Sequence, residues 1–474
     1  MKFGGTSVGD ASCIARVAKI VAEASRETAV VTVVSAMSGV SNLLMEAAAR
    51  AEAGDRDQVG VLLDALRKQH DIALAAMIRN KEERGRLASR MEEVFGEGQR
   101  LCERTMLLHE LTPRTLDSIS SLGERLSALL VAGALRELGV RSEAIEATEL
   151  ITTDSYHSAA EPFMDLTREH SQARLRPLLD QGIVPVVTGF IGATPEGVLT
   201  TIGRGGSDYS AMILGAALDA NEIIIGTDVD GVLTADPRLV PDARTVPEIS
   251  YREVAELAYF GAKVLHPKTL RAVMQAGIPV WIRNSFAPEQ AGTKITPRGR
   301  TIGGDMKALT TIRDVALIAV GGPGIVGLRD VVGRAFSTTA QVRASVLLIS
   351  QSSPQNDICF IVGATDAKRT VDALHMEFAQ DVTHEKVKHI TVDPTIAIVA
   401  IVGENMRGIP GIAGRTFSAV GRENVNILAI AQGSSESNIS FVVAEKDVKA
   451  ALEATHREFG LGGPGSQEQT VVGS

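Results

Sequence analysis

The feature that most constrains the fold is an internal repeat in the last third of the chain. Residues 316–378 and 397–459 align without a gap at a constant offset of 81. The matching pairs include Phe336 with Phe417, Gln351 with Gln432, Phe360 with Phe441, His375 with His456 and Phe378 with Phe459. Each copy is typical of a strand, a glycine-containing turn, a helix, two strands and a helix. The repeat therefore predicts two small α+β sandwiches in tandem.

The first 295 residues follow another pattern, in which aliphatic strands alternate with helices. Aliphatic runs predict strands at 29–34, 183–188, 222–226 and 278–282, and helical patterns occupy 43–116, 208–219 and 251–276. Such alternation predicts an α/β domain with a mostly parallel sheet sandwiched by helices. Its ligands are expected outside the carboxyl ends of the strands.

Composition limits the partners that we expect. A chain of 474 residues is too long for one ordinary hydrophobic core, so two or three domains are predicted. A net charge of −9 argues against nucleic acid, which requires a basic surface. The cysteines Cys13, Cys102 and Cys359 are far apart, which predicts no metal site and favours a reducing cytoplasm. No apolar run approaches the roughly 18 residues that span a bilayer, so no membrane contact is expected.

Two glycine-rich clusters have the chemistry of anion sites. Lys2 stands beside Gly4 and Gly5, where backbone N–H groups and one ammonium can hold a phosphate; a tight turn with a solvated lysine is the alternative. Arg204 lies among the glycines of 203–206, which favours a guanidinium that clamps a carboxylate. Ser207 and Asp208 follow, and either could instead cap the next helix.

Two further clusters are less specific. Glu124 lies in a helical segment, where it could bind a substrate ammonium if buried or could simply face solvent. Polar residues after the 222–226 strand suit a nucleotide, and His266 before a proline is expected to be a structural or capping histidine. The nucleotide candidates are Thr227, Asp228, Asp236, Arg238 and Lys263. These groups fit phosphoryl transfer, in which a protein mainly positions reactants and neutralises charge.

In this order, the clusters resemble the amino-acid kinase family, and within it the aspartate kinases. The motifs are K-F-G-G-T-S at 2–7, V-S-A-M-S-G-V-S-N at 34–42, S-L-G-E at 121–124, G-R-G-G-S-D-Y-S-A at 203–211, G-T-D-V-D-G at 226–231, A-D-P-R at 235–238 and F-G-A-K-V-L-H-P at 260–267. The repeat resembles the family's two ACT domains, and I-S-Q-S-S at 349–353 with I-A-Q-G-S-S-E at 430–436 is most similar to the kinase part of bifunctional aspartokinase–homoserine dehydrogenases.

The resemblance implies phosphorylation of L-aspartate by ATP, and it assigns roles to the clusters. Arg204 and Glu124 would bind the carboxylate and ammonium of aspartate, with Ser35, Ser41, Ser207 and Asp208 completing the pocket. Lys2 and Lys263 would hold the ATP phosphates, with Gly4 and Gly5 beside them. Thr227, Asp228, Asp236 and Arg238 would line the nucleotide side, and Mg²⁺ would be held mainly by ATP.

The resemblance also implies a domain order and a regulatory role. We expect an amino-acid kinase domain at 1–295, ACT domains at 307–390 and 391–460, and a flexible tail at 461–474. Gln351 and Gln432 would contact a regulatory amino acid, threonine or lysine. Pairing of ACT domains would give a homodimer or homotetramer.

Two alternatives remain open. A kinase acting on glutamate, N-acetylglutamate or UMP would lack the two ACT copies and the S-L-G-E segment. A non-catalytic amino-acid sensor would not need the charged residues Lys2, Glu124, Arg204, Asp208 and Lys263. The family's first strand has several apolar residues before the lysine, whereas only Met1 precedes Lys2 here. We therefore expect either a misassigned start or a weakened Lys2.

Overall fold

A computed structural model describes residues 1–262, 265–299, 306–322, 331–351, 357–433 and 437–462. The chain divides into two compact units. The first unit comprises Met1–Val232, Pro247–Tyr251 and Leu265–Gly299, and the second comprises Leu233–Val246, Arg252–Val264 and Arg300–Ser474.

The first unit is built on an eight-stranded sheet. Its strands, in spatial order, are β3 (Ser142–Ile145), β4 (Val184–Thr188), β2 (Thr32–Val34), β1 (Lys2–Phe3), β7 (Ile223–Thr227), β9 (Val280–Asn284), β10 (Thr293–Thr296) and β8 (Glu248–Ser250). All neighbours are parallel except β9 and β10. The predicted mostly parallel sheet is therefore confirmed, and a hairpin of β5 (Ile191–Ala193) and β6 (Leu199–Thr201) lies outside it.

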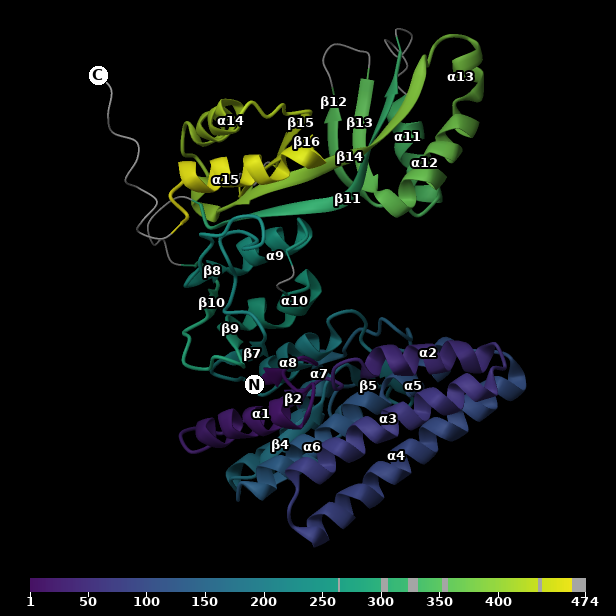
Figure 1. The fold of residues 1–474 in the computed structure, drawn as a ribbon, viewed down its shortest axis with the longest axis vertical. Coiled ribbons are helices and arrows are strands. Elements are labelled where there is room, and N and C mark those ends of the chain that lie inside the picture. The colour runs from purple at the N-terminus through teal and green to yellow at the C-terminus, as the bar shows by residue number, and fades with distance from the viewer. Residues whose placement is uncertain (263–264, 300–305, 323–330, 352–356, 434–436, 463–474) are drawn as a thin grey trace. The chain divides into compact units, whose positions relative to one another are not determined.

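The first unit also contains nine α-helices, counted over its described residues. They are α1 (Ala11–Ala24), α2 (Val40–Glu52), α3 (Arg56–Met77), α4 (Lys81–Leu108), α5 (Pro113–Ser120), α6 (Leu122–Glu137), α7 (Met164–Asp180), α8 (Gly206–Ala217) and α10 (Pro267–Ala276). The predicted helical stretch 43–116 is thus four helices, of which α2, α3 and α4 lie side by side (Figure 1). Asp55, Asn80 and Thr112 start α3, α4 and α5 by accepting backbone N–H groups, as N-cap residues do.

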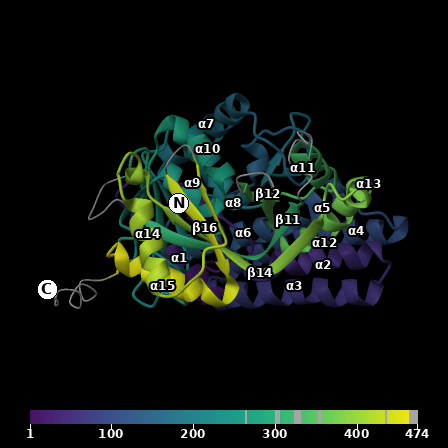
Figure 2. The same cartoon turned by 90° about the horizontal axis from the view of Figure 1, so that it is seen from above.

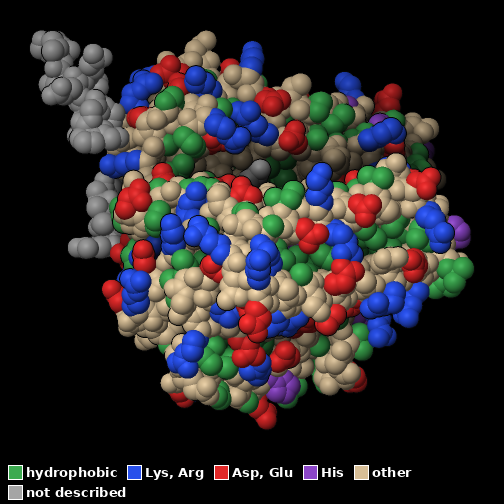
Figure 3. All heavy atoms as spheres, turned by 60° about the horizontal axis from the view of Figure 1, so that its bottom comes forward, with side chains coloured by type: hydrophobic (Ala, Val, Ile, Leu, Met, Phe, Trp, Pro, Cys, Tyr) green, Lys and Arg blue, Asp and Glu red, His purple; other side chains and the backbone are tan. Residues whose placement is uncertain are grey.

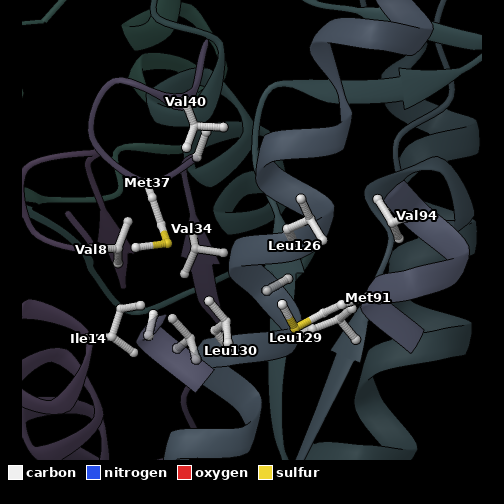
Figure 4. Packing of buried hydrophobic residues seen from close by; sticks show 14 of the residues in the cluster. Val8, Ile14, Val34, Met37, Val40, Met91, Val94, Leu126, Leu129 and Leu130 are labelled. Atoms are coloured by element: carbon white, nitrogen blue, oxygen red, sulfur yellow. The ribbon is translucent and has the colours of Figure 1, made fainter. Parts of the chain in front are cut away.

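Helix α6 is the centre of the hydrophobic core. It contacts β2, β3 and β4 as well as α1, α3 and α4, so almost every residue from Leu122 to Leu135 is buried. This double burial explains why its sequence is aliphatic on all sides. Figure 4 shows Leu126, Leu129 and Leu130 of α6 among residues of neighbouring elements, with Met37 lying next to Val8 and Val34.

The second unit contains the two repeat copies. The first copy is β11 (Ala308–Gly321), α11 (Val331–Gln341), β12 (Val346–Gln351), β13 (Asp357–Gly363), α12 (Ala364–Glu377) and α13 (Ala379–Thr383). The second is β14 (His389–Val402), α14 (Ile412–Arg422), β15 (Ala429–Gln432), β16 (Asn438–Ala444) and α15 (Val448–Glu458). Helix α9 (Tyr251–Tyr259) also belongs here from Arg252 onward.

Both copies share one six-stranded antiparallel sheet in the order β12-β13-β11-β14-β16-β15. The long strands β11 and β14 pair at its centre and run through both copies (Figure 1). From above, α14 and α15 lie at one end of the sheet, and α12 and α13 at the other (Figure 2). The predicted order of elements in each copy is confirmed.

The surface mixes charges of both signs. On the face in Figure 3, acidic and basic side chains are interspersed, with hydrophobic side chains among them. Among the described residues, no helix combines the length and the apolar character that crossing a bilayer requires. Lys263, and residues 463–474 of the predicted tail, lie outside the described residues.

Candidate active site

The candidate site lies where the parallel strands of the first unit end. Gly4 and Gly5 follow β1, Ser35 follows β2, and Asp228 follows β7. Since neighbouring parallel strands all end at one edge, these loops are brought together there, as predicted from the strand pattern. The Gly4 N–H donates to the carbonyl of Gly226, which joins the first loop to the end of β7.

A cavity of about 680 Å³ opens beside the loops that follow β1 and β2. The predicted site residues that line it are Lys2, Gly5, Ser35, Ser41, Glu124, Arg204, Ser207 and Asp208. Met37, Asp117, Ser158, Phe190 and Thr201 line it as well. The residues predicted for the aspartate side, scattered from Ser35 to Asp208 in the sequence, thus line one cavity.

Lys2 and Asp208 form an ion pair on the cavity wall, with Nζ 2.7 Å from Oδ1. Lys2 is buried on the central strand β1, and Asp208 lies in the first turn of α8. The alternative that Ser207 or Asp208 caps this helix is wrong. Gly205 occupies the N-cap position with φ of +70°, a left-handed conformation that glycine adopts without strain.

Glycine also lets Arg204 reach the cavity. A side chain at Gly206 would place its Cβ 2.5 Å from Cδ2 of Phe190, so only glycine fits between α8 and that ring. Arg204 itself is exposed at the cavity, and among the described residues its guanidinium forms no ion pair. It is therefore available to an anionic ligand.

Glu124 is buried, with 5% of its surface exposed, although it lines the cavity. The alternative of a solvated glutamate is wrong. Burial raises the pKa of its carboxyl to about 8, against the opposing effects of backbone hydrogen bonds from Ala36 and Glu124 and of the Lys2 charge. Its Oε2 has no hydrogen-bond partner among the described residues. A buried carboxylate oxygen without a partner is costly, so a cationic ligand group would stabilise it.

The sequence analysis missed Asp117, a cavity-lining residue that is only 1% exposed. Its carboxylate accepts hydrogen bonds from His157 Nδ1 at 2.8 Å, from the Ser158 N–H at 3.1 Å and from the Thr201 hydroxyl at 2.7 Å. It therefore fixes two chain segments of the cavity wall to α5. An aspartate seven residues before the S-L-G-E glutamate has no periodic signal in a single sequence.

The nucleotide candidates lie partly in each unit. In the first unit, Thr227 ends β7, and its hydroxyl donates to Asp228 Oδ1 at 3.1 Å. Beside it, the Ser7 and Ser285 hydroxyls lie 2.7 Å apart. His266 accepts the Lys268 N–H at the start of α10, which confirms the predicted capping histidine.

Asp236 and Arg238 belong to the second unit, where their side chains form an ion pair of 2.7 Å. The hydrogen bond from Arg238 lowers the pKa of Asp236. Arg238 is 85% exposed, so its guanidinium is accessible to solvent and ligands.

The candidate effector residues occupy equivalent places in the repeat. Gln351 ends β12 opposite Ile358, and Gln432 ends β15 opposite Ile439. These are the two edge strands of the six-stranded sheet. The Gln432 side chain is exposed, and that of Gln351 lies outside the described part of the chain.

Comparison with known proteins agrees with this architecture. The model of the amino acid kinase family matches residues 1–284, and an ACT domain model matches residues 318–378 and 399–459. A bifunctional aspartokinase/homoserine dehydrogenase 1 of Arabidopsis thaliana is 34% identical over 467 residues, covering 97% of this chain and 51% of that protein. The chain spans about half the length of the first such curated relatives it matches.

Two solved structures of E. coli aspartokinase III are similar along the whole chain. One, in complex with aspartate and ADP, is 30% identical with a TM-score of 0.77, and the match covers 96% of this chain and 98% of that one. The other, in complex with lysine and aspartate, is 30% identical with a TM-score of 0.78, covering 97% and 98%. By family model, sequence and fold together, the chain belongs to the amino acid kinase family, and within it to the aspartate kinases.

Proposed function

We propose that the chain transfers the γ-phosphoryl group of ATP to the β-carboxylate of L-aspartate and is regulated by an amino acid through its ACT copies. The complex of E. coli aspartokinase III with aspartate and ADP supports aspartate and ATP as the two substrates. The observation that carries the proposal is the buried Glu124, which lines a cavity together with Arg204 and whose Oε2 has no hydrogen-bond partner in the part of the chain that the structure describes. One anionic and one cationic group in a single cavity match the ammonium and carboxylate of an amino acid.

Each side of the cavity then has a role. Glu124 binds the substrate ammonium, and Arg204 binds a substrate carboxylate. Hydroxyl groups of Ser35, Ser41 and Ser207 complete the pocket. Asp208 holds the Lys2 ammonium in place through their 2.7 Å ion pair.

The attacking group is itself a carboxylate, so the reaction needs no general base. A β-carboxylate oxygen forms a bond to the γ-phosphorus while the bond from that phosphorus to the bridging oxygen breaks, and ADP leaves. The main obstacle is repulsion between two anions, which Lys2, Lys263 and Arg204 would reduce. Gly4 and Gly5, with Thr227, Asp228, Asp236 and Arg238, would hold the nucleotide, and Mg²⁺ would be held mainly by the ATP phosphates.

Regulation is proposed to act through the two ACT copies. The complex of E. coli aspartokinase III with lysine and aspartate supports an amino-acid effector. For this chain, we propose threonine or lysine as the effector. Gln351 and Gln432, at the ends of the two edge strands, would contact it. Pairing of these edges between chains would give a homodimer or homotetramer. The free thiols of Cys13, Cys102 and Cys359 support a reducing compartment such as the cytoplasm.

Aspartate-dependent ADP release, followed together with formation of the β-hydroxamate, tests the proposal. We expect Arg204→Ala to raise the KM for aspartate by about 10- to 100-fold, because a charge-assisted carboxylate contact is lost. Arg204→Lys should give a smaller rise. Arg67→Ala, which removes a surface guanidinium paired with Glu92, is the matched control and should leave KM unchanged.

The same assay separates the alternatives. A preference for glutamate, N-acetylglutamate or UMP would indicate a different kinase of the family. ATP turnover that ignores every added acceptor would favour a non-catalytic sensor. An Arg204→Ala enzyme with wild-type kinetics would refute the proposed carboxylate contact.

A further inference from the structure

The second repeat copy holds a chain segment that lies outside the repeat. Residues Leu233–Val246 belong to the second unit, together with both repeat copies. Ala235 and Val240 of this segment are buried in the same hydrophobic cluster as Phe441 and Leu452 of the second copy. Because the segment contains Asp236 and Arg238, we call it the nucleotide-side loop.

Hydrogen bonds join the two ends of the loop. The Thr234 N–H donates to the carbonyl of Arg244 at 2.8 Å, and the Arg244 N–H donates to the Thr234 hydroxyl oxygen at 3.0 Å. Within the loop, the N–H of Val240 donates to the carbonyl of Asp236 at 2.9 Å. These bonds present Asp236 and the exposed Arg238 at the tip of a fixed turn.

One side chain of the second copy contacts both ends of this loop. His456, on α15, has Nε2 3.0 Å from the Thr234 hydroxyl oxygen and Nδ1 3.4 Å from Asp242 Oδ1. The imidazole is 1% exposed, and burial lowers its pKa, against the opposing charge of Asp242 and assisted by that of Arg244. A neutral ring with Nδ1–H toward Asp242 accepts a hydrogen bond from the Thr234 hydroxyl at Nε2.

Backbone bonds reinforce the attachment. The Leu309 N–H, on β11, donates to the carbonyl of Thr234 at 2.8 Å. The Arg244 guanidinium reaches the carbonyl of Gly460, directly after α15, at 3.4 Å. The loop is therefore held to the sheet and to the last helix of the second copy at once.

The first copy provides the internal comparison. His375 is the counterpart of His456 at the offset of 81, but it is exposed. The hydrophobic cluster of the first copy, as far as the structure describes it, lies within residues 316–390 and includes no residue of the nucleotide-side loop. Burial of the histidine is thus a property of the copy that holds the loop.

We infer that His456 is a positioning residue through which the second ACT copy sets the shape of the nucleotide-side loop and hence the affinity for a nucleoside triphosphate. The inference depends on the proposed nucleotide role of Asp236 and Arg238. Because His456 contacts both Thr234 and Asp242, loss of its ring nitrogens would loosen the loop that carries Asp236 and Arg238.

The test measures Mg·ATP binding to the full-length chain by isothermal titration calorimetry, which requires no turnover. We expect His456→Phe, which keeps an aromatic ring but loses both polar contacts, to weaken binding by about tenfold. His456→Gln should recover part of the loss. His375→Phe is the matched control and should bind like wild type. The KM for aspartate should change less than twofold in all three.

Thr234→Val removes the hydroxyl that contacts His456, and its Mg·ATP affinity tests the inference if His456→Phe does not fold. Wild-type ATP affinity in both well-folded variants would overturn the inference. So would equal losses of ATP and aspartate binding together with a lower Tm, because these indicate a purely structural role. If the wild type binds ATP without phosphorylating aspartate, the proposed function fails, and the same titrations still decide the role of His456.

Discussion

The two ACT copies share the same internal contacts, but among the described residues only the hydrophobic cluster of the second includes residues of the nucleotide-side loop. In each, a phenylalanine of the helix contacts a core phenylalanine edge to face: Phe336 with Phe360, and Phe417 with Phe441. Arg334 and Arg415 each stack on the aromatic ring at the end of the following helix. These pairs keep the offset of 81 because they lie entirely within one copy.

The difference lies at the equivalent histidines. His456 is buried against the nucleotide-side loop, whereas His375 is exposed. A repeat therefore preserves contacts that each copy makes with itself, and it diverges where one copy packs against a segment from elsewhere in the chain. The second copy is accordingly the one that holds the loop to which we assign a role in nucleotide binding.

The largest expected effect comes from truncating one buried phenylalanine in the core of each copy. Phe360 and Phe441 are both fully buried, and replacing either by alanine should cost about 3–5 kcal/mol of unfolding free energy. Only Phe441 shares its cluster with Ala235 and Val240. We therefore expect Phe441→Ala to raise the KM for ATP several-fold more than Phe360→Ala. Chemical denaturation and steady-state kinetics on the two variants measure both quantities.

Each variant is the control for the other, because the removed side chain is the same. Equal changes in the KM for ATP would mean that the loop does not depend on the second copy. That result would break the comparison even if the stability losses agreed with expectation.

The smallest effect should come from the two equivalent arginines. Arg334 bonds to Glu377 at 2.6 Å and to Asp381 at 2.9 Å, and Arg415 bonds to Glu458 at 3.0 Å. These pairs are partly exposed, so each alanine variant should lose about 0.5–1 kcal/mol, slightly more at Arg334. Thermal unfolding of the two variants measures this. A loss above about 2 kcal/mol at only one site would show that the copies differ in their own packing as well.

Much of the fold could be predicted from the sequence because its signals are periodic. Aliphatic strands between helices indicated the parallel sheet, and the offset of 81 indicated the paired sandwiches. The helical stretch 43–116 was predicted without its three breaks, since short caps such as Asp55 and Asn80 leave little trace in a helix-rich sequence. In each case the type of element was predictable and its ends were less so.

The site was less predictable, because burial is a tertiary property. Glu124 in a helical segment looked the same whether it faced solvent or a cavity, and only the packing of α6 buries it. Asp117 carried no motif of its own, because its hydrogen-bond partners come from distant segments at 157–158 and 201. The contacts of His456 with Thr234 and Asp242 could not be predicted for the same reason.

The most direct test of the central claim measures the KM for aspartate from about pH 6.5 to 8.5. With a pKa of about 8, Glu124 is mostly protonated at the lower limit and becomes an anion as the pH rises. Since only the anion attracts the substrate ammonium, we expect KM to fall by about 25-fold over this range. Glu124→Gln should show a high KM without that dependence, while the KM for ATP changes little in either enzyme. Identical pH profiles for the wild type and Glu124→Gln would contradict the account.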